Sequence, residues 1–138
     1  MKRPRICAVI VNKDLAAIKK IEPLIDLFEV RIDLIGDGWQ ELAKQLNQPW
    51  IACNRKADEG GRWAKDEARR IDELLKAIEL GADMIDIELR TTNLAETLKL
   101  IKPRAKCLVS SHDLKGTPPF DEMQEIVQRQ FKSRCRCM

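Results

Sequence analysis

Short apolar runs alternate with longer amphipathic segments along the chain, and this alternation constrains the fold more than any other feature of the sequence. Five apolar runs have the composition of β-strands: 6–11, 28–34, 50–53, 84–89 and 107–110. Strands that alternate with helices through short loops lie parallel and are connected by right-handed crossovers. The sequence therefore predicts an α/β fold, either an open doubly wound sheet or a β/α barrel.

The segments between these runs are predicted helices: 15–27, 39–46, 64–80, 94–101 and 121–131. Segment 64–80 has the clearest helical periodicity, and we expect Gly81 to end it. Its expected apolar face consists of Ala64, Ala68, Ile71, Leu75 and Ile78. Asp14 is expected to cap the first helix, and Asn93 with Glu96 has the spacing of a capping box.

The composition indicates one globular domain of a cytoplasmic protein. The chain has 138 residues, 44% of them hydrophobic, and no linker divides it. It has neither the roughly 20 apolar residues that cross a membrane nor a signal peptide, so we expect no membrane partner. Its five cysteines lack a paired C-x-x-C spacing and are expected to be free thiols. The net charge of +3 arises from residues 132–138, which makes a nucleic-acid partner unexpected.

Charged residues share one face of the second apolar run. Because side chains alternate along a strand, Glu29, Arg31 and Asp33 are expected to point one way, and Val30 and Ile32 the other. Three charges on a buried face are costly unless they pair with one another or bind a ligand. A solvated edge strand would also explain the pattern, but its recurrence on later strands argues against that reading.

Polar residues recur at the ends of the next three strands. The same parity places five further residues on this face: Arg55, Asp86, Glu88, Ser110 and His112. Catalytic groups of β/α proteins lie at the carboxyl ends of the strands. The convergence of four strand ends therefore predicts an active site.

Two parts of this set have ordinary explanations when each is taken alone. The loop NRKADEGG, 54–61, reads as a surface turn with an ion pair between Arg55 and Glu59. His112, the only histidine, reads as a side chain bonded to a nearby backbone group. A histidine can also exchange a proton near neutral pH, and a carboxylate can orient its ring. We expect Glu59 to be that carboxylate.

Four motifs together resemble type I 3-dehydroquinate dehydratase, an enzyme of the shikimate pathway. They are EVRIDL at 29–34, R-x-x-x-E-G-G at 55–61, DIEL at 86–89 and S-x-H-D at 110–113. They stand in the family's order and extend over nearly the whole chain. The resemblance implies an incomplete (β/α)8 TIM barrel, with about five β/α units in a single domain over residues 1–138.

The resemblance also implies a chemistry without metal or organic cofactor. In the family a lysine amine forms a Schiff base with the ketone of 3-dehydroquinate, and loss of water gives 3-dehydroshikimate for aromatic amino acid biosynthesis. His112 would remove and return a proton, with Glu59 orienting its ring. Glu29, Arg31 and Arg55 would bind polar groups of the substrate. The implied activity is that of a lyase, a dehydratase acting on a small molecule.

The sequence departs from the family near its end. The family's Schiff-base lysine lies on a sixth strand, and this chain ends at Met138 before such a strand. Neither Lys115 nor Lys132 has a strand position that could replace it. A (β/α)8 barrel usually needs about 250 residues. We therefore expect a truncated barrel that is inactive as it stands. We also expect residues 133–138 to be an aberrant tail that a frameshift would explain. One shifted coding of this tail gives Ala-Gly-Ala-Asp and then a lysine-bearing strand.

Two other functions stay open from the sequence. A catalytically dead fragment could act as a binding or assembly module, and the missing sixth strand favours this reading. Another Schiff-base β/α enzyme, such as an aldolase, is disfavoured by the combination of the R-x-x-x-E-G-G and S-x-H-D motifs. The sequence also leaves homo-oligomerisation open.

Overall fold

The computed structural model describes residues 2–133 and contains one parallel sheet with the strand order β1-β2-β3-β4-β5. The strands are β1 Cys7–Ile10, β2 Leu27–Arg31, β3 Trp50–Cys53, β4 Met84–Glu88 and β5 Lys106–Ser110. Neighbours in the chain are therefore neighbours in the sheet, as expected for successive right-handed β/α units. The prediction of five parallel strands in sequence order is confirmed.

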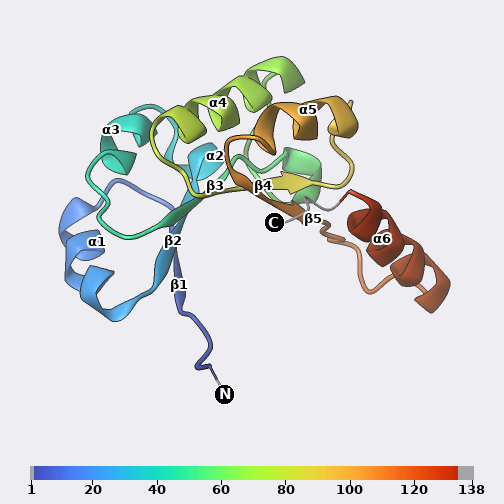
Figure 1. Cartoon of the computed structure of the whole chain (residues 1–138), viewed down its shortest axis with the longest axis horizontal. Helices are drawn as coiled ribbons and strands as arrows, with labels where there is room; N and C mark the ends of the chain where they lie inside the picture. The colour runs from blue at the N-terminus through green and yellow to red at the C-terminus, as the bar shows by residue number, and fades with distance from the viewer. Residues whose placement is uncertain (1, 134–138) are drawn as a thin grey trace.

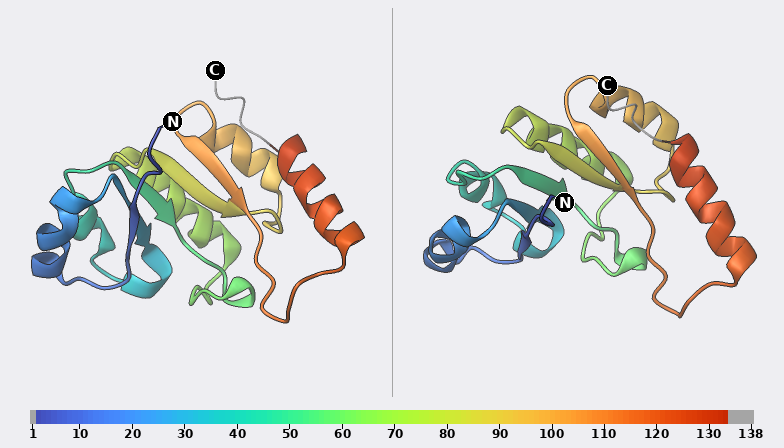
Figure 2. Two further views of the ribbon diagram at one scale, coloured as in Figure 1. Left: turned by 90° about the horizontal axis from the view of Figure 1, so that it is seen from below. Right: turned by 60° about the horizontal axis from the view of Figure 1, so that its bottom comes forward.

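Helices α1 to α5 form an arc over one face of the sheet, and α6 lies beyond β5 at its edge (Figures 1 and 2). The helices are α1 Leu15–Ile21, α2 Ile32–Ile35, α3 Trp39–Ala43, α4 Glu67–Glu79, α5 Leu94–Ile101 and α6 Phe120–Lys132. Two short 3-10 helices are η1 Glu22–Leu24 and η2 Ala57–Glu59. Gln130 of α6 donates a hydrogen bond of 2.9 Å to the carbonyl of Val109 in β5. None of the helices in residues 2–133 is long and apolar enough to cross a membrane.

The hydrophobic core lies between the sheet and its arc of helices. Strand residues of one parity supply one side of the core: Ile10, Phe28, Val30, Trp50, Ala52, Ile85 and Ile87. The helices supply the facing residues, among them Ile18, Trp39, Leu42, Leu74, Ala77, Leu98 and Ile101. Because side chains alternate along each strand, the other parity points to the uncovered face, and this is the parity of the predicted site.

The predicted strand 28–34 and the predicted helix 64–80 differ from the structure in their boundaries. Strand β2 ends at Arg31, and the chain turns at once into α2, so Asp33 lies on a helix and not on the strand face with Glu29. Helix α4 begins only after Asp66, whose side chain accepts a hydrogen bond from the N–H of Arg69. Residues 64 and 68 are exposed, so the expected apolar face was wrong there.

The helix ends follow the sequence signals in two of three cases. The Asp14 side chain caps α1 by accepting from the N–H of Ala17, as predicted. Gly81 ends α4 in the left-handed region, with φ of 98°, which is also as predicted. Asn93 has φ of 55° and makes no side-chain capping bond, so the predicted capping box with Glu96 is wrong.

Within residues 2–133, Cys7, Cys53 and Cys107 form no disulfide, which agrees with the prediction of thiols. Cys135 and Cys137, with the tail that the frameshift interpretation concerns, lie outside the described residues.

The inner face of the sheet, defined by Cys7, Val9, Ile51, Met84 and Leu108, has no helix against it within residues 2–133 (Figure 1). Val9 is 52% exposed and Leu108 is 43% exposed, although parallel sheets are normally covered on both faces. Strands β1 and β5 also have one unpaired edge each in this sheet. Exposed apolar surface next to open strand edges promotes association.

We therefore expect the chain to self-associate at high concentration. Replacement Leu108→Lys places a charge on the inner face and should reduce the associated fraction, as measured by light scattering. Leu100→Lys is the matched control, because Leu100 is 55% exposed on α5 and away from this face. A parent chain that stays monomeric at high concentration would contradict the expectation.

Candidate active site

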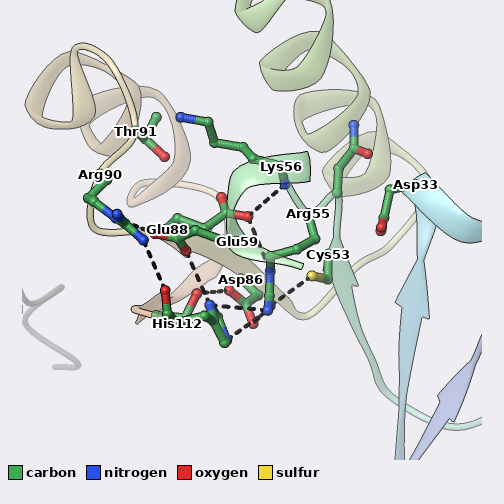
Figure 3. Close-up of polar contacts among 12 residues, drawn as sticks. Asp33, Cys53, Arg55, Lys56, Glu59, Asp86, Glu88, Arg90, Thr91 and His112 are labelled. Atoms are coloured by element: carbon green, nitrogen blue, oxygen red, sulfur yellow. Dashed lines mark hydrogen bonds and ion pairs between the residues drawn. The ribbon is translucent and has the colours of Figure 1, made fainter. Parts of the chain in front are cut away.

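Polar side chains from three neighbouring strand ends meet at the carboxyl edge of the sheet (Figure 3). Arg55 follows β3 by two residues, Asp86 and Glu88 lie on β4, and His112 follows β5 by two residues. Because parallel strands end at the same edge, residues 57 positions apart in the chain come into contact. The sequence predicted a convergence of four strand ends, and Arg31 at the end of β2 binds Asp33 instead of these residues.

The guanidinium of Arg55 is the centre of this cluster. Its Nη2 donates to Asp86 Oδ2 at 3.0 Å and to Cys53 Sγ at 3.2 Å. Its Nε lies 3.1 Å from Glu88 Oε1, and its Nη1 lies 2.7 Å from His112 Nε2. Arg55 is buried, so these contacts form in a medium where charges interact more strongly than in water.

His112 lies between a carboxylate and a guanidinium. Its Nδ1 is 3.2 Å from Glu59 Oε2, the contact expected from the sequence. Arg55 Nη1 lies 2.7 Å from Nε2 and 3.2 Å from Nδ1, so a ring with its proton on Nδ1 donates to Glu59 and accepts from Arg55 at Nε2. Glu59 is also bound by Arg90, whose Nε donates at 2.8 Å and whose Nη2 donates to the His112 carbonyl at 2.9 Å.

The carboxylates of the inner face repel one another. Burial and the charge of Asp86 raise the pKa of Glu29. Burial also raises the pKa of Asp86, although Ser110 donates to it at 2.5 Å and Arg55 lies beside it. Glu29 and Asp86 consequently take up a proton at a higher pH than ordinary carboxyl groups do.

The loop from Arg55 to Trp63 holds Glu59 in place. The N–H of Trp63 donates to the Arg55 carbonyl at 3.1 Å, and the N–H of Gly61 donates to the Lys56 carbonyl at 2.8 Å. A Cβ at Gly61 would lie 2.0 Å from the Arg55 carbonyl oxygen, so only glycine fits. The second glycine of the motif therefore closes the loop on which Glu59 stands.

Arg31 has a different partner from the rest of the cluster. Its Nε and Nη2 bind Asp33 at 2.9 and 2.8 Å, and Asp33 also accepts from the N–H of Arg62 at 3.0 Å. Burial raises the pKa of Asp33, but the bonds from Arg31 and Arg62 outweigh it and leave that pKa below its ordinary value. The pair thus ties the end of β2 to the loop that carries Glu59.

Sequence reasoning missed Arg70, which lies on α4 and is fully buried. Its Nη1 binds Glu88 Oε2 at 2.6 Å, and its Nη2 binds Thr91 Oγ1 at 2.9 Å. Two further bonds of 2.8 and 2.9 Å join it to Glu67. The available signal was its spacing with Leu74 and Ala77, which puts an arginine on the buried face of the helix. Arg90, the second missed residue, directly follows the DIEL motif.

Within residues 2–133, one group of side chains has the spacing of a metal site. Ligand atoms of Glu29, Cys53 and Asp86 lie within 4.8 Å of one another. Arg55 already donates to Cys53 and Asp86, so a guanidinium supplies the positive charge that a metal ion would bring. Burial raises the pKa of the Cys53 thiol, which makes it a poor metal ligand.

A parallel sheet with helices on one face and polar groups at its carboxyl edge defines a part of a β/α-barrel enzyme fold. Solved structures support this assignment of the fold. A 3-dehydroquinate dehydratase from Enterococcus faecalis matches with a TM-score of 0.80 at 24% identity, covering 96% of this chain and 63% of that one. The same enzyme from Aquifex aeolicus matches with a TM-score of 0.75 at 24% identity, covering 93% and 62%.

The family model for type I 3-dehydroquinase matches residues 6–138, and the chain belongs to this family of hydro-lyases. A 3-dehydroquinate dehydratase from Dehalococcoides mccartyi is 41% identical over 128 residues, which cover 93% of this chain and 58% of the relative. One from Methanosarcina barkeri is 35% identical, covering 94% and 60%. The chain thus spans about three fifths of the length of these relatives.

The Gly61 contact predicts that Gly61→Ala lowers the free energy of unfolding by about 2–3 kcal/mol, because a methyl group would overlap the Arg55 carbonyl. Urea denaturation measures this change. Ala57→Ser, an exposed change in the same loop, is the control and should stay within about 0.5 kcal/mol. Equal stability of the Gly61→Ala variant and the parent would refute the close approach.

The Asp33 pair predicts a pH-dependent loss of stability. A lowered folded-state pKa means that the carboxylate stabilises the fold above its ordinary pKa of about 3.9 and loses this effect as the pH falls through the folded-state value. Asp33→Asn should cost about 1–3 kcal/mol at pH 7, and the cost should shrink below pH 4. Urea denaturation at both pH values tests this, with the exposed Asp37→Asn as the control. A cost that does not change with pH would contradict the ion pair.

Proposed function

We propose that this chain supplies the proton-transfer and substrate-binding part of a 3-dehydroquinate dehydratase site in the cytoplasm. The reaction converts 3-dehydroquinate to 3-dehydroshikimate and water in the shikimate pathway. The observation that carries the proposal is the placement of His112 Nδ1 against Glu59 and of Nε2 against Arg55, at a strand-end edge. Family membership supports it.

His112 is proposed to carry the proton. In the reaction a lysine amine condenses with the substrate ketone and releases water, which leaves an iminium group that withdraws electrons. His112 takes the proton from the neighbouring carbon, and the electron pair expels the hydroxyl group, which leaves as water with that proton. Hydrolysis of the iminium consumes one water and frees the lysine, so the net change is the loss of one water.

Glu59 is proposed to position His112. Its side chain is fully buried and it binds both the ring and Arg90, so it holds Nδ1 protonated and leaves Nε2 as the base. Glu29, Arg31 and Arg55 are proposed to bind polar groups of the substrate. Arg55 must then exchange its contact with His112 for one with the substrate.

The lysine nucleophile is proposed to lie outside this part of the fold. Among the residues that Figure 3 labels, Lys56 is the only lysine, and its ammonium points away from His112. The chain alone would then bind substrate without forming the imine. This is the observation that favours the second candidate, a catalytically dead fragment that acts as a binding or assembly module.

We expect the chain to bind 3-dehydroquinate weakly and to produce no 3-dehydroshikimate at a meaningful rate. Binding is measured from the shift of the His112 imidazole signal in NMR, and Arg55→Gln should weaken it at least about tenfold through the loss of charged hydrogen bonds. Arg104→Ala, an exposed change outside the site, is the control.

Turnover is followed by absorbance, and any imine is trapped with borohydride and located by mass spectrometry. A trapped adduct on Lys115 or Lys132 together with turnover would overturn the proposed role of an external lysine. The absence of any binding would overturn the proposed function itself.

A further inference from the structure

We propose that Arg70 is a positioning residue that acts through Glu88 and thereby decides which groups Arg55 can bind. The inference rests on the proposed function, because it assigns a role within the same site. Arg70 lies on α4, and its guanidinium hydrogen bonds go to Glu67, Thr91, Glu88 and the Asn54 carbonyl, not to His112. Its effect on the site passes through one carboxylate.

The side chain of Arg70 is buried and fixed by several hydrogen bonds. It is fully buried, and its guanidinium binds Glu67 twice, Thr91, the Asn54 carbonyl at 3.1 Å and Glu88. A buried guanidinium with acceptors on every side is fixed in one orientation. The bond of 2.6 Å to Glu88 Oε2 is the shortest of the set.

The carboxylate of Glu88 consequently lies between two arginines, Arg70 and Arg55. Its Oε2 faces Arg70, while its Oε1 accepts from the N–H of Lys56 at 3.2 Å. The same Oε1 lies 3.1 Å from Arg55 Nε, but the N–H is not aligned for a hydrogen bond. Arg70 thus holds the Glu88 carboxylate in an orientation that attracts Arg55 but does not form a two-point hydrogen-bonded pair with it.

The loose contact leaves both terminal nitrogens of Arg55 available to the site. Nη1 reaches His112, and Nη2 reaches Asp86 and Cys53. Without Arg70, Glu88 would be a buried carboxylate with one partner removed, which is strongly unfavourable. It would then turn to Arg55 and form a two-point pair through Nε and one terminal nitrogen, which is the preferred geometry. The terminal nitrogen of Arg55 that binds Glu88 would then lose its contact with His112 or Asp86.

The test compares Arg70→Met with Arg69→Met, in the ligand-free chain and with 3-dehydroquinate. Arg69 is the adjacent arginine on the same helix, and its side chain is 71% exposed. His112 is the only histidine in the sequence, so its imidazole protons give an unambiguous NMR signal. Arg70→Met should move this signal and weaken 3-dehydroquinate binding about tenfold, and Arg69→Met should do neither.

The double variant Arg70→Met with Glu88→Gln separates positioning from packing. A neutral amide at position 88 no longer competes for Arg55, so the His112 signal and the affinity should return toward the parent values. A role in packing alone predicts no recovery. A folded Arg70→Met variant with an unchanged His112 signal, or a double variant without recovery, would overturn the proposal.

Arg70→Lys covers the case in which the methionine variant does not fold. Lysine keeps the charge but lacks the planar fork that binds Glu67, Glu88 and Thr91 together, so the His112 signal should move part of the way. An unchanged signal in this variant counts against the proposal. The ligand-free signal does not depend on substrate, so a chain that binds no 3-dehydroquinate refutes the proposed function while the Arg70 test still gives a result.

Discussion

The burial of one face of the parallel sheet against its helices determines where every other strand side chain must point. Phe28, Val30, Ala52 and Ile85 are packed into the core with essentially no exposure. Their neighbours in the chain are forced to the opposite face, because the side-chain period of a strand is two residues. A register shift of one residue would bury Glu29 and Asp86 among the helices, so the hydrophobic contacts enforce the geometry of the polar site.

The site itself is an alternating row of charges. Glu67, Arg70, Glu88 and Arg55 follow one another, and the row continues through His112 to Glu59 and Arg90. Each buried charge has neighbours of the opposite sign, which offsets the cost of removing it from water. Truncation of Arg70 or Arg55 removes a positively charged partner from the buried Glu88, so these three members of the row depend on one another.

The sequence predicted the strands, their order and the contact between Glu59 and His112, because these depend on periodicity and on short motifs. The sequence did not predict the position of Asp33. The alternating strand pattern continues through this residue, but the backbone turns into a helix that no local signal marks. The sequence also failed at Arg70, since an arginine in an amphipathic helix is expected to face water unless a buried carboxylate on another strand is known. Glu88 and Thr91 beside Arg70, and Arg62 beside Asp33, come from distant segments, and a single sequence does not display these contacts.

Two arginines of the charge row differ in their access to water. Arg70 has no exposed side-chain surface, whereas the Arg90 side chain is 53% exposed. Dissolved ions screen exposed pairs and leave buried ones almost untouched. Dissolved salt therefore weakens the ion pair between Arg90 and Glu59 more than the buried pair between Arg70 and Glu88.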